Sequence, residues 1–379
     1  MSMDFEMLKR RVPATPSYVF DRNAISSIVR KLSAIRQTSD CKVLYSIKAL
    51  PLTGVLQWLA PNVDGFSVSS LFEARLADEM LAGQGSIHLT SPGVRAAEAV
   101  ELTRLCSHIS CNSLNQYRLF TGLHDGRAEI GLRLNPGGSF LDDTRYDPCR
   151  PNSKLGVHLS ELDSAQDIMT VKGVHFHTVF SVMSFEPLFR TFEVIKKKLG
   201  ARWGQVKWLN LGGGYLYDQI EDLGVFIEWV RALKSESALE VYIEPGKAIV
   251  GQSGVLLTTV VDSFVSNGKN IAVLDTTVNH HPEVFEYQFQ PELHEHRPGG
   301  QYSFILAGSS CLAGDLFGEY RFDRPLVIGD KLIFKNAGAY TLVKAHRFNG
   351  YNLPDIYALD NGKLTLLKRY GYPDYRELW

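Results

Sequence analysis

From Tyr18 to about Val250, short runs of β-branched and aromatic residues alternate with longer amphipathic segments. The short runs are typical of buried strands, and the apolar spacing of the longer segments indicates helices that bury one face. A strand followed by a helix, repeated about eight times over roughly 230 residues, is the order and length of a (β/α)8 barrel. A doubly wound open sheet shows the same alternation and is the competing architecture.

The alternation predicts individual elements. The expected strands are Lys42–Ile47, Ile87–Thr90, His108–Cys111, Glu129–Leu134, Gly173–Val179, Val206–Leu211 and Glu240–Glu244. The expected helices are Ala24–Arg36, Ser70–Leu81, Arg95–Leu105, Phe185–Leu199 and Phe226–Lys234, with Asp21 and Ser69 as two of the N-caps. In a barrel, polar or unusual residues at the carboxyl ends of strands form the active site. This rule singles out Lys48, His177, Gly212–Gly214 and Glu244.

After about Val250 the pattern changes to short strand-like runs between turn residues, without long helical periodicity. These runs are Val255–Val265, Ile271–Asp275, Tyr302–Ala307, Lys331–Asn336 and Tyr340–His346. We therefore expect an α/β protein with a (β/α)8 TIM barrel over residues 18–250 and a mostly β domain over residues 251–379. An N-terminal strand in about residues 1–17 would join the β domain. The 379-residue length suits two domains.

Composition narrows the class of function. The chain has 40 Lys and Arg against 41 Asp and Glu, so it lacks the basic excess of a nucleic-acid-binding surface. Met1–Arg11 contains no apolar run, and the best apolar stretch, Gly254–Val261, is far too short to cross a bilayer. Five cysteines without a CxxC pair favour neither a disulfide framework nor a zinc site. We expect a cytoplasmic protein that binds a small molecule and neither nucleic acid nor membrane.

Three barrel features are candidates for chemistry, each with a plain structural alternative. Lys48 ends a buried strand, where desolvation makes a lysine a Schiff-base nucleophile, although such a lysine also commonly reaches out to solvent. The glycines Gly212–Gly214 let backbone N–H groups approach a phosphate, or simply form a turn, and the GxGxxG spacing of a dinucleotide site is not met. Glu244 can hold a heteroaromatic nitrogen protonated, or cap the next element.

Other candidates are equally ambiguous when taken alone. His175 and His177 could stack on a flat ligand, ligate a metal or be satisfied core histidines, and a metal is disfavoured because no third ligand stands at suitable spacing. Cys311 and Asp315 share a Gly/Ser-rich loop, where a thiol can donate a proton and a carboxylate can bind an ammonium group. Tyr340 alone would be an ordinary strand tyrosine.

Together these motifs resemble a known family. The chain is similar to the fold-III (alanine racemase-like) pyridoxal phosphate decarboxylases, and within them to the carboxynorspermidine/carboxyspermidine decarboxylase family. The resemblance covers about Thr15 to Pro354. Its motifs are Tyr45-Ser-Ile-Lys-Ala49, Tyr146-Asp-Pro-Cys149, Ser153-Lys-Leu-Gly156, His175-Phe-His-Thr178, Trp208-Leu-Asn-Leu-Gly-Gly-Gly214, Cys311-Leu-Ala-Gly-Asp315 and Phe348-Asn-Gly-Tyr-Asn-Leu-Pro354.

The resemblance implies how pyridoxal 5'-phosphate (PLP) would be bound. Lys48 would form the aldimine with the cofactor, and His177 would stack on the pyridine ring. Glu244 would pair with the ring nitrogen and stabilise a quinonoid, which favours decarboxylation over racemisation. The phosphate would be bound by a larger set: Gly212, Gly213, Gly214, Gly246 and Tyr340.

The resemblance also implies a composite active site in a homodimer. The loop that carries Cys311 and Asp315 would reach the site of the second subunit, where Cys311 would reprotonate the substrate carbon and Asp315 would hold the cationic end of the substrate. Asp275 and His281, at the ends of another divergent segment, are expected to contact substrate.

Three segments depart from the family pattern near the expected substrate pocket. Val179-Phe180-Ser181 replaces a usual Leu-Cys-Glu, Lys247 replaces a frequent glutamate, and Asp275–His281, which includes Asn279 and His280, replaces a Ser-Ala-Thr-Cys-His run. Ser181 stands where the family's Leu-Cys-Glu has its glutamate, and the loss of this negative charge weakens the case for a long cationic substrate. The main alternative is a decarboxylase of another amino acid, such as a diaminopimelate-like compound or a siderophore or specialised-metabolite intermediate. A non-catalytic binding protein of the antizyme-inhibitor type is disfavoured because the cofactor residues remain.

Overall fold

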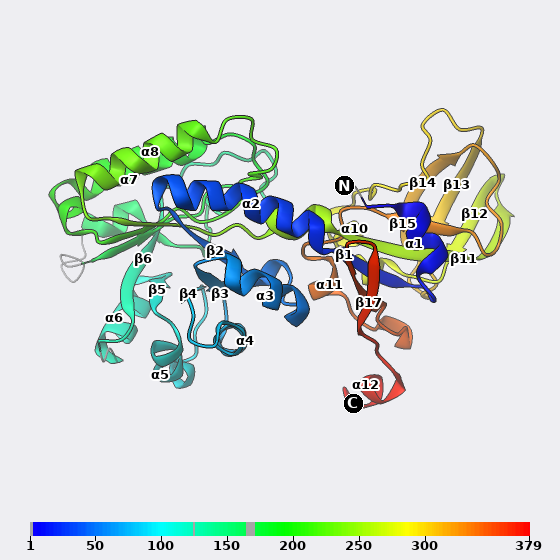
Figure 1. The fold of residues 1–379 in the computed structure, drawn as a ribbon, viewed down its shortest axis with the longest axis horizontal. Helices are drawn as coiled ribbons and strands as arrows, with labels where there is room; N and C mark the ends of the chain where they lie inside the picture. The colour runs from blue at the N-terminus through cyan, green and yellow to red at the C-terminus, as the bar shows by residue number, and fades with distance from the viewer. Residues whose placement is uncertain (1–2, 124–125, 164–170) are drawn as a thin grey trace. The chain divides into compact units, whose positions relative to one another are not determined.

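The computed structural model describes residues 3–123, 126–163 and 171–379, which divide into two compact units (Figure 1). One unit is Ile28–Ala248, and the other combines Met1–Ser27 with Ile249–Trp379. Residues 1 and 2 of the expected N-terminal strand lie outside the described residues.

The first unit is a closed barrel of eight parallel strands. The strands, each hydrogen-bonded to the next, are β2 (Lys42–Ser46), β3 (Gly65–Val68), β4 (Ser86–Ser91), β5 (His108–Cys111), β6 (Glu129–Asn135), β8 (Gly173–His175), β9 (Trp208–Asn210) and β10 (Glu240–Ile243). A short strand, β7 (Val157–His158), pairs with the end of β6. Because β10 also pairs with β2, no edge remains open, which confirms the (β/α)8 barrel and excludes the doubly wound open sheet.

Two differences from the expected strands have local causes. The strand β3 was not predicted, because its four residues Gly-Phe-Ser-Val form too short a run to stand out. The strand β8 ends at His175 and not at Val179. The chain then turns toward the glycine loop, where the N–H of Val182 donates to the carbonyl of Gly214 at 2.9 Å. His177 therefore lies on a loop beyond the strand.

Helices alternate with the strands of the barrel (Figure 1). They are α2 (Arg22–Ser39), which starts in the other unit, α3 (Thr53–Leu59), α4 (Leu71–Leu81), α5 (Ala96–Leu105), α6 (Leu114–Leu123), α7 (Glu186–Leu199) and α8 (Gly224–Glu236). The helices α3 and α6 were not predicted. The N-cap of α4 is Ser70 and not Ser69: the Ser70 hydroxyl accepts the N–H of Glu73, and the Glu73 carboxylate accepts the N–H of Ser69.

The second unit contains an eight-stranded mixed sheet. Its strand order is β14 (Leu316–Phe322), β13 (Tyr302–Ala307), β12 (Lys269–Leu274), β11 (Gly254–Ser266), β1 (Ser17–Asp21), β16 (Asp355–Asp360) and β17 (Lys363–Lys368), with β15 (Lys331–Phe334) also on β11. The strand β1 begins only at Ser17, after the helix α1 (Phe5–Arg11), and the unit boundary falls after it, at Ser27. Every residue of β1 is buried, so its sequence looks like that of a barrel strand.

The strand expected over Tyr340–His346 is wrong. Tyr340 has φ +65°, in the left-handed region, and a short helix, α11 (Thr341–Lys344), follows it. The preceding Gly338 lies so close to Val250 that a Cβ there would sit 1.7 Å from the Val250 carbonyl oxygen. The chain must therefore turn sharply here, and a left-handed tyrosine is a strained conformation that often marks a functional position.

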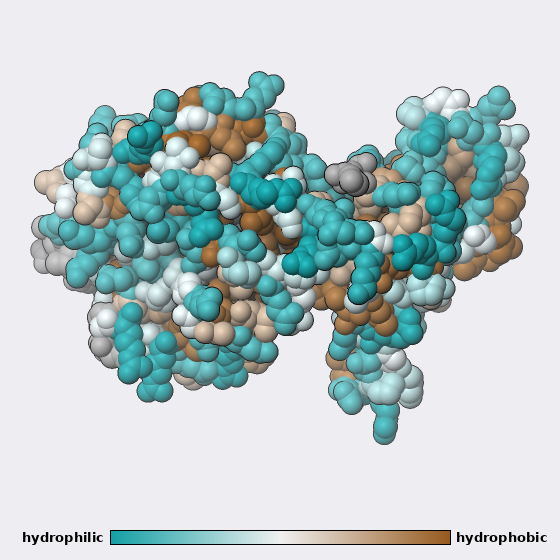
Figure 2. Space-filling view, viewed as in Figure 1, coloured by the Kyte–Doolittle hydropathy of each residue, from teal (hydrophilic) through white to brown (hydrophobic). Residues whose placement is uncertain are grey.

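Hydrophilic side chains cover most of the visible surface of each unit, and apolar side chains gather beside β11 and β12 (Figure 2). The exposed apolar residues of β11 are Val261, Phe264 and Val265. Among the described residues, no helix is long and apolar enough to cross a membrane.

Candidate active site

Lys48 lies immediately after β2, at the carboxyl end of the barrel. Its side chain keeps exposed surface, yet the protein packed around it lowers the pKa of the ammonium group through desolvation. Glu244 and Glu73 oppose this shift, and Arg133 adds to it. A lowered pKa increases the fraction of free amine, so Lys48 is suited to act as a nucleophile.

Glu244 directly follows β10, the strand that pairs with β2, and is 6% exposed. Its Oε1 accepts a hydrogen bond from Asn210 Nδ2 at 2.8 Å, and its Oε2 lies 3.8 Å from His175 Nε2. Its backbone N–H donates to the carbonyl of Gly212 at 2.8 Å. A buried carboxylate is costly unless it faces donors or cations, so this arrangement suits a positively charged partner.

His177 reaches the same place from the loop after β8. Its Nδ1 accepts the N–H of Gly213 at 3.1 Å. Burial, followed by the charges of Lys48 and Arg133, holds the pKa of the imidazole well below its usual value. The ring is therefore neutral and half-buried, with its proton on Nε2, which suits it to stack on a flat ligand.

The positions 212–214 tolerate only glycine, because neighbouring backbone atoms leave no room for a Cβ. A Cβ at Gly212 would lie 2.5 Å from the Phe176 carbonyl oxygen, at Gly213 2.3 Å from that of Glu244, and at Gly214 2.2 Å from that of Val179. Gly212 and Gly214 also have positive φ.

Two of the four predicted phosphate-binding glycines already use their N–H groups. Gly212 donates to Asn210 Oδ1 at 2.9 Å, and Gly213 donates to His177. Gly246 packs against the other wall, where a Cβ would lie 3.0 Å from the Cβ of Ala49. The loop is thus a rigid cradle that fixes Asn210 and His177.

Sequence reasoning missed three residues of this site. Arg133 is 8% exposed within β6, and burial lowers the pKa of its guanidinium while Glu244 opposes the shift. Asn210 is fully buried and links Glu244 to the glycine loop. Burial raises the pKa of Glu73, whose charge interacts with that of Lys48. A charged side chain inside the apolar run Glu129–Asn135 was the available signal for Arg133.

In the β domain, Cys311 is an exposed free thiol whose backbone N–H donates to Asn349 Oδ1 at 2.8 Å. Asp315 is 3% exposed. Its Oδ1 accepts the N–H of Val278 at 2.7 Å, and its Oδ2 accepts both the N–H and the hydroxyl of Ser310. These contacts favour a role for Asp315 in holding the loop around Cys311 over the expected contact with substrate.

The remaining predicted residues also lie in the β domain. Asp275 accepts hydrogen bonds from Thr258, Thr259 and Thr15, so its carboxylate is occupied in joining strands to the N-terminal segment. His281 is 2% exposed, and burial lowers its pKa to about 4. Burial raises the pKa of the Tyr340 hydroxyl to about 12.

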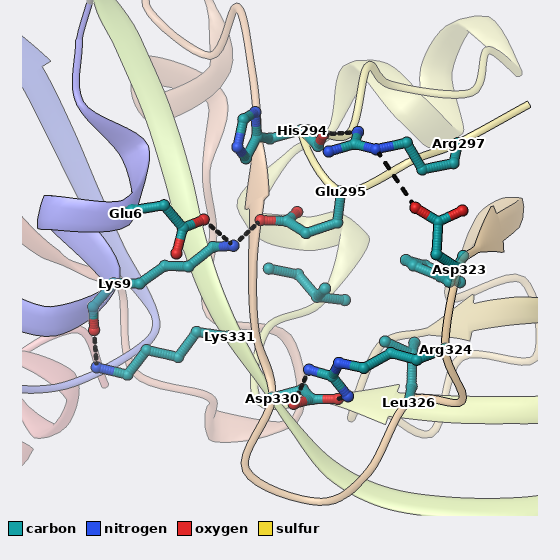
Figure 3. Close-up of a pocket in the computed structure, with 12 residues that line it drawn as sticks. Glu6, Lys9, His294, Glu295, Arg297, Asp323, Arg324, Leu326, Asp330 and Lys331 are labelled. Carbon is teal, nitrogen blue, oxygen red and sulfur yellow. Dashed lines mark hydrogen bonds and ion pairs between the residues drawn. The ribbon is translucent and has the colours of Figure 1, made fainter. Parts of the chain in front are cut away.

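A pocket in the β domain, about 310 Å³ in volume, is lined by four carboxylates and four cations (Figure 3). Lys9 Nζ lies 2.6 Å from Glu295, and Arg324 pairs with both oxygens of Asp330. The positive and negative charges that line this pocket neutralise one another, so they offer little net charge to a charged substrate. The ion pair between Lys9 and Glu295 instead joins α1 to the rest of the β domain.

The barrel site fits PLP. Lys48 offers an amine, Glu244 a buried carboxylate, His177 a neutral ring, and Gly212–Gly214 a cradle that any Cβ would fill. Fold and site together define a barrel enzyme that uses PLP. A model of the family described as "Pyridoxal-dependent decarboxylase, C-terminal sheet domain" matches residues 17–338. The chain belongs to this family and is a PLP-dependent carboxy-lyase.

Individual relatives agree with this assignment. The carboxynorspermidine/carboxyspermidine decarboxylase of Campylobacter jejuni is 32% identical over 95% of this chain and 97% of its own. The carboxyaminopropylagmatine decarboxylase of Synechocystis is 34% identical over 96% of this chain and 94% of its own. The crystal structure of carboxynorspermidine decarboxylase from Campylobacter jejuni, complexed with norspermidine, has a TM-score of 0.85 and 30% identity, and covers 96% of this chain and 99% of that one.

Proposed function

We propose that this chain decarboxylates carboxynorspermidine or carboxyspermidine, the substrates named for its relative from Campylobacter jejuni. The observation that carries the reaction is the buried carboxylate of Glu244, just after β10, which accepts a hydrogen bond from Asn210 at the end of β9. When bound, PLP supplies a ring that accepts the electrons released as the carboxylate leaves. Glu244 holds the proton on the ring nitrogen that makes this possible.

The other barrel residues orient the cofactor. Lys48 would hold the cofactor through its amine, whose lowered pKa favours the free base. His177 would pack its neutral imidazole against the ring. We assign the phosphate to the N–H groups of Gly214 and Gly246, since those of Gly212 and Gly213 are engaged within the loop.

The β domain completes the reaction in this proposal. The Sγ of Cys311 donates a proton to the substrate carbon that has lost CO₂, so that one proton is taken up for each CO₂ released. Asp315 keeps the loop in place, and Tyr340 adds a hydroxyl to the phosphate site. We propose that Cys311 acts in the site of the second subunit of a cytoplasmic homodimer, and exposed aromatic side chains in this domain, Phe285, Phe289 and Phe348, support an interface.

A second substrate class is favoured by one feature of the barrel. Lys247 Nζ lies 3.1 Å from Ser181 Oγ and 5.0 Å from the centre of the Phe180 ring, which stacks on Tyr146. This ammonium group repels a long cationic substrate. A shorter diaminopimelate-like amino acid is the alternative that this repulsion favours. Carboxyaminopropylagmatine, named for the Synechocystis relative, is itself long and cationic and is compared because of that relative.

One experiment separates these substrates. The holoenzyme is incubated with carboxynorspermidine, carboxyspermidine, carboxyaminopropylagmatine or diaminopimelate, and CO₂ release is followed. The proposal expects kcat/KM to be highest for one of the first two. Turnover of only the third or fourth compound replaces the substrate while keeping the reaction, and no CO₂ from any of them refutes the proposed function.

A further inference from the structure

The proposed function leaves a buried histidine of the barrel, His175, without a role. His175 is the last residue of β8 and is 1% exposed. Its Nδ1 lies 3.3 Å from the hydroxyl of Thr90 on β4, and its Nε2 lies 3.8 Å from Glu244 Oε2. Among the described residues, Nε2 has no hydrogen-bond partner. A buried polar nitrogen without a partner is costly and calls for an explanation.

The two carboxylate oxygens of Glu244 differ in their hydrogen bonding. Oε1 accepts a direct hydrogen bond from Asn210 at 2.8 Å, whereas Oε2 faces His175 across 3.8 Å, which is too long for a hydrogen bond. Polar contacts of a reaction centre are often long before the ligand binds and shorten in the loaded site. A small rotation of the carboxylate closes this gap and satisfies both Nε2 and Oε2.

The protonation state of His175 suits a donor to Glu244. Burial, followed by the charges of Arg133, His177, Lys48 and His88, holds its pKa well below the usual value, so the ring is neutral. When the Thr90 hydroxyl donates to Nδ1, the ring proton is placed on Nε2, facing Glu244. A neutral N–H orients the carboxylate without adding a positive charge that would compete with a protonated ring nitrogen for Glu244.

We propose that His175 is a positioning residue that fixes Oε2 of Glu244 and thereby aims this carboxylate at the ring nitrogen of PLP. The inference rests on the proposed role of Glu244. His175 acts through Glu244 and touches neither the substrate nor the phosphate cradle.

The test compares variants that differ in where they present an N–H. His175→Gln places an amide N–H near the position of Nε2, His175→Asn places it near that of Nδ1, and His175→Phe removes it. His88→Gln is the matched control. His88 is also a buried barrel histidine, and its Nδ1 has no hydrogen-bond partner in the described part of the chain, but its ring stacks on His108 at 4.0 Å. Each variant is examined for PLP dissociation constant, the pH dependence of the absorption band of the bound cofactor, and kcat and KM.

For His175→Phe and His175→Asn we expect kcat to fall about tenfold to hundredfold, the scale of one lost hydrogen bond to a charged group, with KM changed less than about twofold. The absorption band should titrate at a different pH, and His175→Gln should restore most of both properties. A His175→Phe enzyme with the wild-type band and kcat, or a His88→Gln enzyme with the same losses, overturns the proposal.

Misfolding and failure of the proposed function are distinguished separately. Thermal unfolding of each protein without cofactor shows whether a variant folds, and His175→Gln serves where His175→Phe does not. If the wild-type enzyme releases no CO₂ from any tested amino acid, the proposed function fails, while the PLP dissociation constants and absorption bands still decide the role of His175.

Discussion

The barrel and the β domain hold their chemical groups in opposite ways. In the barrel, Lys48 and Glu244 stand at the ends of neighbouring strands and Gly213 is pressed between backbone segments, so strand register places each group. In the β domain, the carboxylates of Asp315 and Asp275 accept hydrogen bonds from backbone N–H and hydroxyl groups. Of these three candidate residues, only Cys311 is exposed. The barrel thus fixes its candidate residues through strand register, whereas the β domain carries its candidate residues on loops that hydrogen bonds hold in place.

Removal of the Lys48 amine from the barrel should have the largest effect on activity. Lys48→Ala should lower kcat by about four orders of magnitude or more, because the amine proposed to bind the cofactor is lost. The absorption band of bound PLP should disappear. The matched control is Lys42→Ala, at the amino end of the same strand and ion-paired with Asp40. Equal losses in both variants would show that strand β2 had been damaged.

A methyl group in the cradle should have the next largest effect. Gly213→Ala places a Cβ 2.3 Å from the Glu244 carbonyl oxygen, so the loop or β10 must shift. We expect PLP affinity to fall about tenfold to hundredfold and stability to fall by about 1–3 kcal/mol, as in other overpacked sites. Gly122→Ala is the control, because it lies in α6 with open space around it. Fluorescence titration with PLP measures the difference, and an unchanged dissociation constant would contradict a rigid cradle.

In the β domain, two residues of one loop should have different roles: Asp315 should contribute to stability, and Cys311 to the reaction. Asp315→Asn weakens three hydrogen bonds to a buried carboxylate and should lower the free energy of unfolding by about 2 kcal/mol. Cys311→Ala should leave stability and PLP binding unchanged while lowering kcat and altering the reaction product. Chemical denaturation and product analysis check both. If Cys311→Ala is as unstable as Asp315→Asn and forms the normal product, the thiol is structural.

The same contrast explains how far sequence reasoning reached. The barrel was predictable because strand–helix alternation and the strand-end rule locate Lys48 and Glu244 without knowledge of contacts. Arg133 and Asn210 were missed because their roles arise from side chains of different strands meeting inside the barrel, which no local pattern records. Tyr340 was placed on a strand because the tight approach of Gly338 to Val250, distant in sequence, forces the turn.

Acid should test whether the two regions unfold as separate units. Burial lowers the pKa of His108 in the barrel to about 4, as it does for His281 in the β domain. An unfolded histidine titrates near pH 6.5, so between pH 6.5 and 4 the unfolded chain binds a proton that the folded chain does not, and stability falls as pH falls. His108→Phe keeps a ring against His88 and should reduce this slope by up to about 1.4 kcal/mol per pH unit. His281→Phe should reduce it by a similar amount, whereas substitution of the exposed His158 by Phe should leave the slope unchanged.

The measurement is denaturant unfolding at several pH values. If the two units unfold separately, each substitution should flatten the pH dependence of only one transition. A single transition flattened equally by both substitutions would show that the rigid barrel and the loop-dependent β domain unfold together.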